Sequence, residues 1–385
     1  MRKPLMRIPY TDLLPSPTIH PPSATSLSGA VSALQNFFSA PPPRGLPPST
    51  VVLTGAGLSV ASGLADYRGV NGTYRVNKTY RPIYYHEFLE NHEARKRYWA
   101  RSFLGWTTLA KAKPNAGHYA VRDLRELGVV SRVITQNVDS FHPRAHPRIP
   151  TLELHGYLRA TNELARLNPA WADFLREVIA SGALETEDPD ERRRRGIRTN
   201  PDGDVDLPDA PYTTFRYPAC PTCLASPPRL ADGSQVRVEV DGEGAWKKPS
   251  SGGILKPAVV MFGESIPSGV KHAVEEAIDG AGRLLVLGTS LATYSAWRLA
   301  KRAKDRGMPI AIVNVGGVRG EEAFFTDLDP NQTGTQGVRA EASIQELLPA
   351  LVDVMQRSTP KRGQEQSPAI LHQPDGASVF KDMMS

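Results

Sequence analysis

Cysteine is nearly absent from this chain of 385 residues, which contains only Cys220 and Cys223. Two cysteines this close together build no disulfide framework. Long apolar runs are also missing, and no stretch approaches the length that a bilayer-spanning helix requires. With 40% hydrophobic and 22% charged residues, the composition is that of an ordinary globular protein without a membrane span.

A large excess of charge of one sign is lacking as well. The net charge is +6, and part of it comes from the basic run 191–195. Such a run can contact nucleic acid or acidic lipid, but it is more often a solvated loop. It lies within the stretch 181–211, which has almost no apolar periodicity and reads as a surface insertion. We therefore expect no specific nucleic-acid binding.

The stretch from Val51 to Gly72 organises the rest of the chain. It opens with a short apolar, β-branched run that is typical of a buried parallel strand. Gly55 and Gly57 follow at once, and such a turn lets the backbone approach a pyrophosphate near the N–H groups of the next helix. The third glycine of the usual dinucleotide fingerprint is displaced to Gly63. Taken alone, the motif therefore fits any α/β nucleotide-binding loop.

Polar residues follow several further apolar runs. The run 129–134 leads to Gln136, Asn137 and Asp139, and His155 follows soon after. The runs 283–287 and 309–313 alternate with helical patterns and end in polar or glycine turns. These turns contain Gly288, Thr289, Ser290, Asn314, Val315 and Gly316. The alternation predicts an α/β fold with a doubly wound, Rossmann-like parallel sheet whose ligand lies at the carboxyl ends of the strands.

Several motifs, in this order and at this spacing, resemble the sirtuin family of NAD-dependent protein deacylases. They are GAGLSVASGLADYRG (55–69), TQNVDSFH (135–142), ELHG (153–156), KPAVVMFGE (256–264), GTS (288–290) and NVG (314–316). Each motif alone is modest evidence, but their common register over about residues 27–325 is specific. The resemblance implies NAD as cofactor and acylated proteins as substrates.

The same resemblance implies where NAD binds. Its pyrophosphate would lie over the turn of Gly55, Ala56 and Gly57, and Ser290 and Asn314 would bond the adenosine ribose. Asp66 and Arg68 would order the flexible loop and the cofactor. The remaining implied contacts are Ser59, Gly63, Tyr67, Gln136, Asn137, Asp139, Gly288, Thr289, Val315 and Gly316.

In sirtuins the acyl oxygen of an acyl-lysine displaces nicotinamide from its ribose. By resemblance, His155 is then the general base that activates a ribose hydroxyl, and Asn137 and Asp139 complete the catalytic set. An imidazole, with an ordinary pKa of about 6.5, can accept that proton at cellular pH. The implied products are nicotinamide, the deacylated lysine and O-acyl-ADP-ribose.

The aromatic and basic run 80–106 resembles the helical insert of class II sirtuins. Tyr98 and Arg101 fit the Tyr-x-x-Arg spacing of sirtuins that prefer acidic acyl groups, although plain packing of the lobe is the alternative. One helical turn would place a phenol and a guanidinium on one face, where both could hold a carboxylate. In the family, the segment containing Val260, Phe262, Gly263 and Glu264 pairs with the substrate peptide by strand addition.

The zinc ribbon of the family is incomplete in this chain. Cys220 and Cys223 match one of its two cysteine pairs, but the pair expected after His155 is missing, and residues 156–219 contain no histidine. Two thiolates do not make a closed tetrahedral site. Either zinc has been lost, a short segment has been deleted, or the sequence carries a gene-model error.

The expected organisation is a leader (1–26), a catalytic domain (27–325) with a small lobe from about 73–112 and 157–250, and an extension (326–385). The extension should be mostly disordered, apart from one helix at 342–356. We expect a monomer in the mitochondrial matrix, with the nucleus or cytoplasm as alternatives. The functional alternatives are protein mono-ADP-ribosyl transfer and a degenerate, NAD-binding protein without turnover.

Overall fold

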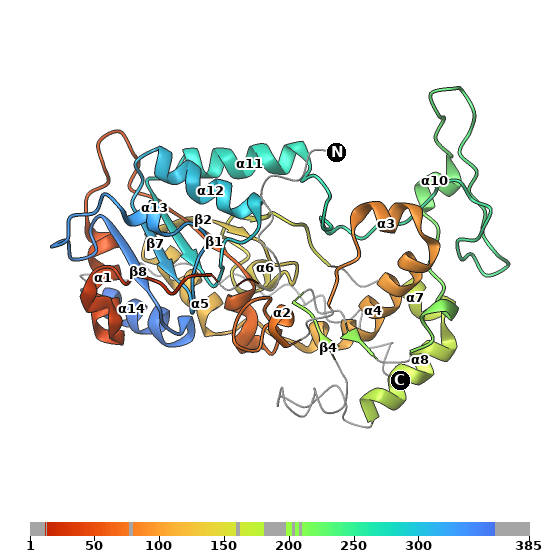
Figure 1. Ribbon diagram of the computed structural model, residues 1–385, viewed down its shortest axis with the longest axis horizontal. Helices are drawn as coiled ribbons and strands as arrows, with labels where there is room; N and C mark the ends of the chain where they lie inside the picture. Colours follow the sequence, from red (N-terminus) through yellow and green to blue (C-terminus); the bar gives the residue numbers. More distant parts are fainter. Residues whose placement is uncertain are drawn as a thin grey trace, which may run out of the picture.

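The computed structural model describes residues 12, 14–76, 80–158, 162–180, 198–201, 205–207 and 210–358. Within these residues a large lobe is built around a parallel sheet, and a smaller, mostly helical lobe extends from it (Figure 1). Most of the expected insertion at 181–211, and the end of the expected extension at 359–385, lie outside the described residues.

The sheet has six parallel strands in the order β3-β2-β1-β6-β7-β8. Their bounds are β1 (Thr50–Thr54), β2 (Val130–Thr135), β3 (Thr151–Glu153), β6 (Arg283–Leu287), β7 (Ile310–Val313) and β8 (Gly337–Ala340). The chain moves outward from β1 to one edge and from β6 to the other. The strand order therefore reverses between β1 and β6, which confirms the predicted doubly wound sheet.

Helices cover both faces of this sheet. One face packs against α1 (Leu27–Ser39), α5 (Ala116–Glu126) and α14 (Ile344–Ser358). The other packs against α11 (Ser268–Asp279) and α12 (Tyr294–Asp305). Alternate residues of one strand enter opposite cores, so Val52 joins the first cluster while Val51 and Leu53 join the second. Burial on both faces explains why these strands are continuous apolar runs in the sequence.

The expected boundary at residue 325 is wrong, because the sheet continues beyond it. The final strand is β8, and α14, at about the place expected for the last helix, packs against α1. The strand is hard to recognise because it contains Arg339, which is fully buried. Its guanidinium pairs with the buried Glu321 and donates to the carbonyls of Asn314 (3.0 Å) and Gly316 (2.6 Å). These partners satisfy a charge that would otherwise be costly to bury.

The small lobe has its own apolar core, drawn from residues 83–104 and 164–261. Its helices are α3 (Tyr85–Glu90), α4 (His92–Lys111), α7 (Asn162–Leu167), α8 (Pro169–Ala180) and α10 (Pro221–Ala225). The lobe also contains a two-stranded antiparallel ribbon of β4 (Arg198–Thr199) and β5 (Val205–Asp206). The remaining short elements are η1 (Pro22–Thr25), η2 (Ala56–Ser62), α2 (Thr73–Val76), α6 (Phe141–Ala145), η3 (Tyr212–Thr214) and α13 (Glu322–Phe325).

A cation–aromatic cluster around Arg95 links α4 to the loops that follow α8. Arg95 is buried, and its Nε donates to the hydroxyl of Tyr217 at 2.7 Å while Nη1 donates to the carbonyls of Phe88 and Leu89. Its guanidinium lies 4.7 Å from the ring centroid of Trp246. Such a desolvated contact contributes about 2 kcal/mol or more. The cluster thus fixes the loops that carry Cys220 and Cys223 to the helical part of the lobe.

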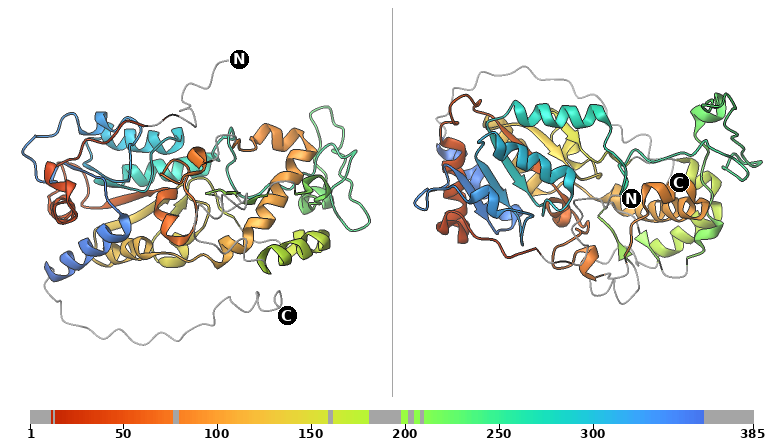
Figure 2. Two further views of the ribbon diagram at one scale, coloured as in Figure 1. Left: turned by 60° about the horizontal axis from the view of Figure 1, so that its bottom comes forward. Right: turned by 45° about the horizontal axis from the view of Figure 1, so that its top comes forward.

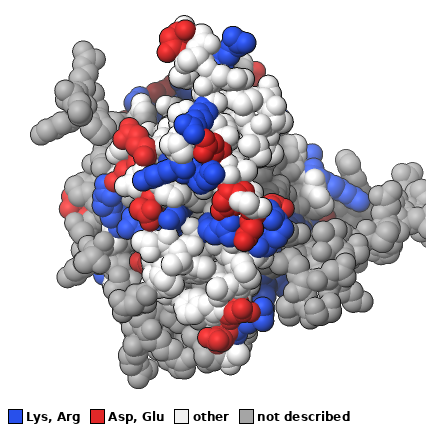
Figure 3. Space-filling model, turned by 90° about the vertical axis from the view of Figure 1, so that its right-hand side faces the viewer, with Lys and Arg blue, Asp and Glu red and all other residues white. Residues whose placement is uncertain are grey.

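The outer end of the small lobe carries mixed charge. Acidic and basic side chains alternate over this face in Figure 3, without a broad field of one sign. Several are paired, as Arg216 is with Asp241 and Arg237 is with Glu239. The two views of Figure 2 place this end of the molecule opposite α1 and α14. No helix in the described part of the chain is long and apolar enough to cross a membrane.

Three histidines are buried together beneath the carboxyl end of β1. The Oγ1 of Thr54 lies 2.9 Å from Nε2 of His142, and Nδ1 of His142 lies 2.8 Å from Nε2 of His146. The ring centroid of His118 lies 5.0 Å from that of His142. Burial lowers the pKa of all three, that of His118 to about 3. All three rings are therefore neutral near physiological pH.

This cluster predicts loss of stability in acid. A buried histidine with a lowered pKa binds fewer protons in the folded than in the unfolded state. Each histidine therefore lowers the free energy of unfolding as pH falls below its unfolded-state pKa of about 6.5. The loss is at most about 1.4 kcal/mol per pH unit, and it ends when pH reaches the folded-state pKa. Urea unfolding between pH 8 and pH 4 should show a shallower decline for His118→Gln than for wild type. His272→Gln, at an exposed site on α11, is the control and should keep the wild-type slope. Equal slopes for His118→Gln and wild type would contradict this account.

Candidate active site

The glycine turn after β1 packs directly against the turn after β6. The N–H of Gly57 donates to the carbonyl of Gly288 at 2.8 Å, and the N–H of Gly55 donates to that of Leu287 at 3.1 Å. Gly288 has a φ of +59°, and a Cβ placed there would lie 2.4 Å from the backbone nitrogen of Leu58. Only glycine fits this approach. The two turns therefore form one bare backbone surface at the point where the strand order reverses.

The predicted residues after β2 meet the residues of this turn. The side chain of Asn137 donates to the carbonyl of Gly55 (3.0 Å) and to Oγ of Ser59 (3.1 Å). Ser59 in turn donates to Asp139 at 2.7 Å, and the N–H of Phe141 donates to the same carboxylate at 3.0 Å. Burial raises the pKa of Asp139, and these two bonds oppose that rise. The sequence reasoning thus named three side chains that the fold brings together.

Gln136 joins three strand ends at this edge of the sheet. Its Nε2 donates to the carbonyl of Thr54 at 3.1 Å and to Oγ1 of Thr289 at 2.9 Å. Its Oε1 accepts a bond of 3.0 Å from Oγ1 of Thr293. One amide side chain therefore holds the ends of β1, β2 and β6 to the start of α12.

His155 follows β3 and faces the same edge. Its Nδ1 lies 3.2 Å from the carbonyl oxygen of Gln136, and its Nε2 lies 2.8 Å from Oγ of Ser295. Burial lowers the pKa of His155 to about 4, while the bond to Gln136 acts in the opposite direction. The imidazole is thus neutral at cellular pH and has a nitrogen that can accept a proton.

The loop from Gly63 to Gly72 folds back on itself through Asp66. The N–H of Gly69 donates to this carboxylate at 3.0 Å, and burial raises its pKa. Tyr67 stacks on Tyr74, with ring centroids 5.2 Å apart. Arg68 donates to the carbonyl of Asp12 at 3.1 Å. Gly63 has a φ of +84° and ends the short helix η2. Asp66 thus shapes the loop, whereas Arg68 reaches toward the N-terminal segment.

The residues predicted for the far half of the cofactor follow β6 and β7. The side chain of Asn314 is buried and donates to the carbonyls of Val315 (3.0 Å) and Gly316 (3.1 Å). Val315 is 61% exposed. The carbonyl of Ser290 accepts a bond from the N–H of Arg319 at 2.9 Å. A short polar rim therefore continues from the glycine turns along the ends of β6 and β7.

The predicted peptide-binding segment lies between the two lobes. The N–H of Val260 donates to the carbonyl of His155 at 2.8 Å, and the carbonyl of Phe262 accepts from Tyr85 at 2.9 Å. Gly263 has a φ of +83°, and Glu264 forms an ion pair with Lys256 at 3.0 Å. The segment forms isolated bridges rather than a strand. It lies beside the candidate base and has backbone that is not part of a continuous sheet.

Tyr98 and Arg101 both lie on α4, as the spacing predicted. Tyr98 is partly buried and meets Phe88 edge to face, with ring centroids 5.3 Å apart. Arg101 is buried to 5% exposure, and its guanidinium lies 5.9 Å from the ring centroid of Tyr80. A guanidinium and a phenol one turn apart on one helix are groups that can bond a carboxylate.

Cys220 and Cys223 flank the start of α10 as free, partly buried thiols. Backbone hydrogen bonding from Cys223 lowers the pKa of Cys220, and the hydrogen bond with Cys220 raises that of Cys223. Among the described residues, no group of three or more His, Cys, Asp or Glu side chains is arranged to hold a metal ion. Within the described part of the chain, these two thiols therefore lack the further ligands that a closed tetrahedral zinc site needs.

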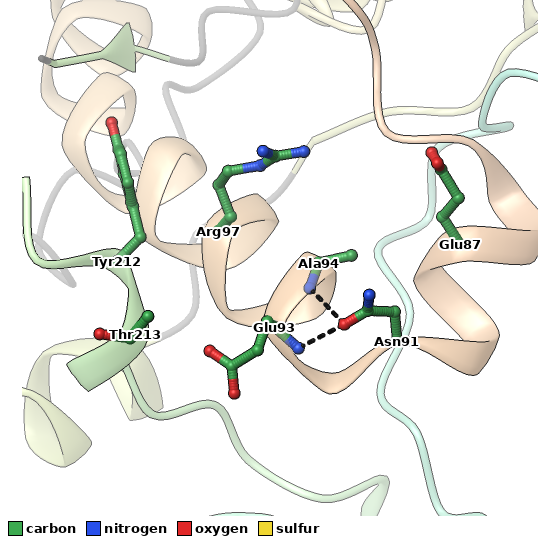
Figure 4. Close-up of a pocket in the computed structure, with 7 residues that line it drawn as sticks. All are labelled: Glu87, Asn91, Glu93, Ala94, Arg97, Tyr212 and Thr213. Atoms are coloured by element: carbon green, nitrogen blue, oxygen red, sulfur yellow. Dashed lines mark hydrogen bonds between the residues drawn. The ribbon is translucent and has the colours of Figure 1, made fainter.

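Two hollows in the described structure lie in the small lobe, away from the strand ends. The one in Figure 4, of about 300 Å³, is lined by Glu87, Asn91, Glu93, Ala94, Arg97, Tyr212 and Thr213. There the side chain of Asn91 accepts from the N–H groups of Glu93 (2.8 Å) and Ala94 (3.2 Å), which caps α4. The second is lined by residues 89–93, 95, 246, 248–251 and 254. Neither contains a residue that the sequence predicted for the site.

Sequence reasoning missed Ser295 and Thr293, whose hydroxyls bond His155 and Gln136. Serine and threonine at the start of a helix are ordinary capping residues, so no sequence pattern sets these two apart. Their roles depend on the distance between α12 and the end of β2, which only the fold reveals.

Comparison with known proteins agrees with this geometry. Residues 55–295 match the model of the Sir2 family. The NAD-dependent protein deacylase SIR4 of Batrachochytrium dendrobatidis is 39% identical over 71% of this chain and 83% of that relative. The NAD-dependent protein deacetylase 1 of Streptomyces coelicolor is 35% identical over 85% of this chain and 90% of its own length. The NAD-dependent protein deacylase SRT2 of Arabidopsis thaliana is 32% identical over 80% and 74%, respectively.

A solved structure described as a basis for the mechanism and regulation of Sir2 enzymes aligns with 87% of this chain and 100% of its own, with a TM-score of 0.50. At 23% identity this likeness shows the fold alone. The assignment to a family rests on the match to the family model and on the sequence identity to the curated relatives. This chain belongs to the Sir2 family.

Proposed function

We propose that His155 is the general base of an NAD-dependent protein-lysine deacylation, with Asn137 and Asp139 completing the catalytic set. Family membership makes the chain an NAD-dependent protein deacylase. The observation that supports the residue roles is the convergence of two bare glycine turns, a buried Asn–Ser–Asp cluster and a neutral imidazole at the switch point of the sheet. Ligands of doubly wound sheets bind at this point.

The residues present fit NAD. Close backbone approach at Gly55, Gly57 and Gly288 leaves a surface without side chains, which suits a pyrophosphate. Ser290 and Asn314 would bond the adenosine ribose, and Gln136 would lie beside the nicotinamide ribose. The other proposed contacts are Ala56, Ser59, Gly63, Asp66, Tyr67, Arg68, Thr289, Val315 and Gly316.

When bound, NAD supplies an electrophilic ribose carbon and nicotinamide as a leaving group. Asn137 and Asp139, already fixed by Ser59 and Gly55, would orient the ribose without reorganisation during the reaction. Nε2 of His155 would accept a proton from a ribose hydroxyl. Val260 and Phe262 would hold the acyl-lysine peptide beside this base by backbone pairing, with Gly263 and Glu264 shaping the turn that follows.

Replacing the base tests this assignment. His155→Tyr removes the imidazole and should lower deacylation of an acyl-lysine peptide by on the order of 10² to 10⁴. NAD binding, measured by calorimetry, should persist because the glycine turns are unchanged. His272→Gln on the exposed face of α11 should keep wild-type turnover. If His155→Tyr retains more than about a tenth of the wild-type rate, another group supplies the base.

We also propose that Tyr98 and Arg101 favour acyl chains that end in a carboxylate. The supporting observation is a buried guanidinium one helical turn from a phenol, both within the small lobe. The class II assignment and the mitochondrial matrix location are proposals that rest on the resemblance of this lobe to class II sirtuins. The monomeric state is a proposal that rests on the resemblance of the whole chain to the family.

The acyl preference can be inverted. Arg101→Met removes the charge and keeps apolar bulk, so relative kcat/KM for glutaryl-lysine over acetyl-lysine peptides should fall by about tenfold or more, as expected for loss of a desolvated ion pair. Arg97→Met is the control, since Arg97 is an exposed arginine of the same helix. An unchanged acyl profile in Arg101→Met would rule out this role.

We further propose that the fold does not depend on zinc. The motive is the missing cysteine pair together with the Arg95 cluster, which links the same loops without a metal. Structural zinc contributes roughly 10 kcal/mol or more where it is present. A protein that folds without it should be insensitive to its removal.

Elemental analysis of the purified protein should therefore find well under one equivalent of zinc. A strong chelator should leave the melting temperature unchanged, and the double variant Cys220→Ser, Cys223→Ser should melt at the wild-type temperature. One tightly held zinc per monomer, lost together with the fold on chelation, would contradict this proposal.

A further inference from the structure

The imidazole of His155 is held from both sides. Nδ1 faces the backbone carbonyl of Gln136 at 3.2 Å, and Nε2 faces Oγ of Ser295 at 2.8 Å. A carbonyl oxygen can only accept a hydrogen bond, so Nδ1 carries the proton in the neutral ring. Nε2 then has the free electron pair, and the hydroxyl of Ser295 must donate to it. Both bonds thus select the tautomer that leaves Nε2 as the base.

Ser295 is placed by the same residue that orients the other side of the ring. It lies in the first turn of α12, two residues after the N-cap residue Thr293. Thr293 donates to the side-chain oxygen of Gln136 at 3.0 Å, while the backbone oxygen of Gln136 receives Nδ1. Gln136 therefore couples the start of α12 to the imidazole, and the position of the serine hydroxyl is fixed with it.

We propose that Ser295 is a positioning residue for His155. Its hydroxyl donates to Nε2 and so keeps this nitrogen oriented and unprotonated until the ribose hydroxyl takes the place of the serine hydroxyl. The inference rests on the proposed role of His155 as base. A bond donated to Nε2 is possible only in the neutral ring, so it favours the state that can accept a proton.

Charged neighbours do not explain why the imidazole of His155 is neutral. Asp139, on the loop after β2, bonds Ser59, and Glu153 at the end of β3 accepts from Ser140 at 2.7 Å. On the helices packed nearby, Arg298 pairs with Glu275. Beyond the peptide-binding segment, Lys256 pairs with Glu264. In the described structure, the hydrogen-bond partners of the ring are the carbonyl of Gln136 and the hydroxyl of Ser295.

The test follows the ring directly in the cofactor-free protein. ¹⁵N-histidine NMR, with the His155 signals assigned by their loss in His155→Tyr, reports the tautomer and the titration together. In Ser295→Ala the Nδ1-protonated tautomer should lose population, and the pKa of His155 should rise by about half a unit to one unit, as removal of one hydrogen bond to the neutral ring predicts. Ser295→Thr keeps the donor and should restore both values. Ser268→Ala, at an exposed serine in the first turn of α11, is the matched control.

Activity supplies the second readout. Ser295→Ala should lower kcat for deacylation about threefold to tenfold near neutral pH, with KM for NAD unchanged, and should move the acidic limb of the pH profile upward. Wild-type tautomer and pKa in Ser295→Ala would overturn the inference. A lower kcat in Ser295→Ala without any change at the ring would overturn it too. If wild type itself showed no deacylation, the proposed function would fail while the NMR result still decided the role of Ser295.

Discussion

The close backbone contact between the turn at Gly55–Gly57 and Gly288 is the constraint on which the rest of this structure depends. It joins the ends of the two central strands, β1 and β6, and leaves no room for a Cβ between them. Because the helices α5 and α12, which follow β1 and β6, cover opposite faces of the sheet, the contact lies where doubly wound sheets bind their ligands and forms the floor of the candidate site. Asn137 bonds this floor directly, and Ser59 and Asp139 are bonded to it through Asn137.

Burial determines the electrostatics around that floor. Desolvation raises the pKa of Asp139 and lowers that of His155, so both groups are displaced toward their neutral forms. The hydrogen bonds from Ser59 and Phe141 keep the carboxylate ionisable, whereas the carbonyl of Gln136 holds the imidazole in one tautomer. A preorganised acceptor and a neutral base within one crevice need little rearrangement to act on a ribose.

The sequence predicted the parts of this arrangement that depend on local pattern. Apolar runs marked β1, β2, β6 and β7, and glycine or polar turns marked their carboxyl ends, since these signals come from burial on both faces and from backbone geometry. It failed where a tertiary partner overrides the local pattern. The charged residue Arg339 makes β8 hard to recognise in the sequence, because its buried partner Glu321 is known only from the fold. Ser295 has the sequence context of an ordinary helix-start serine, and only the fold places it beside His155. The Arg95 cluster likewise joins residues that are far apart in the chain.

Product analysis tests most directly whether these groups act together as a deacylase. The protein is incubated with NAD and an acyl-lysine peptide, and nicotinamide, deacylated peptide and free O-acyl-ADP-ribose are quantified by mass spectrometry. The site described above predicts all three products in equal amounts, with formation lost in His155→Tyr. ADP-ribose attached to protein in place of free O-acyl-ADP-ribose, or NAD binding without any turnover, would contradict it.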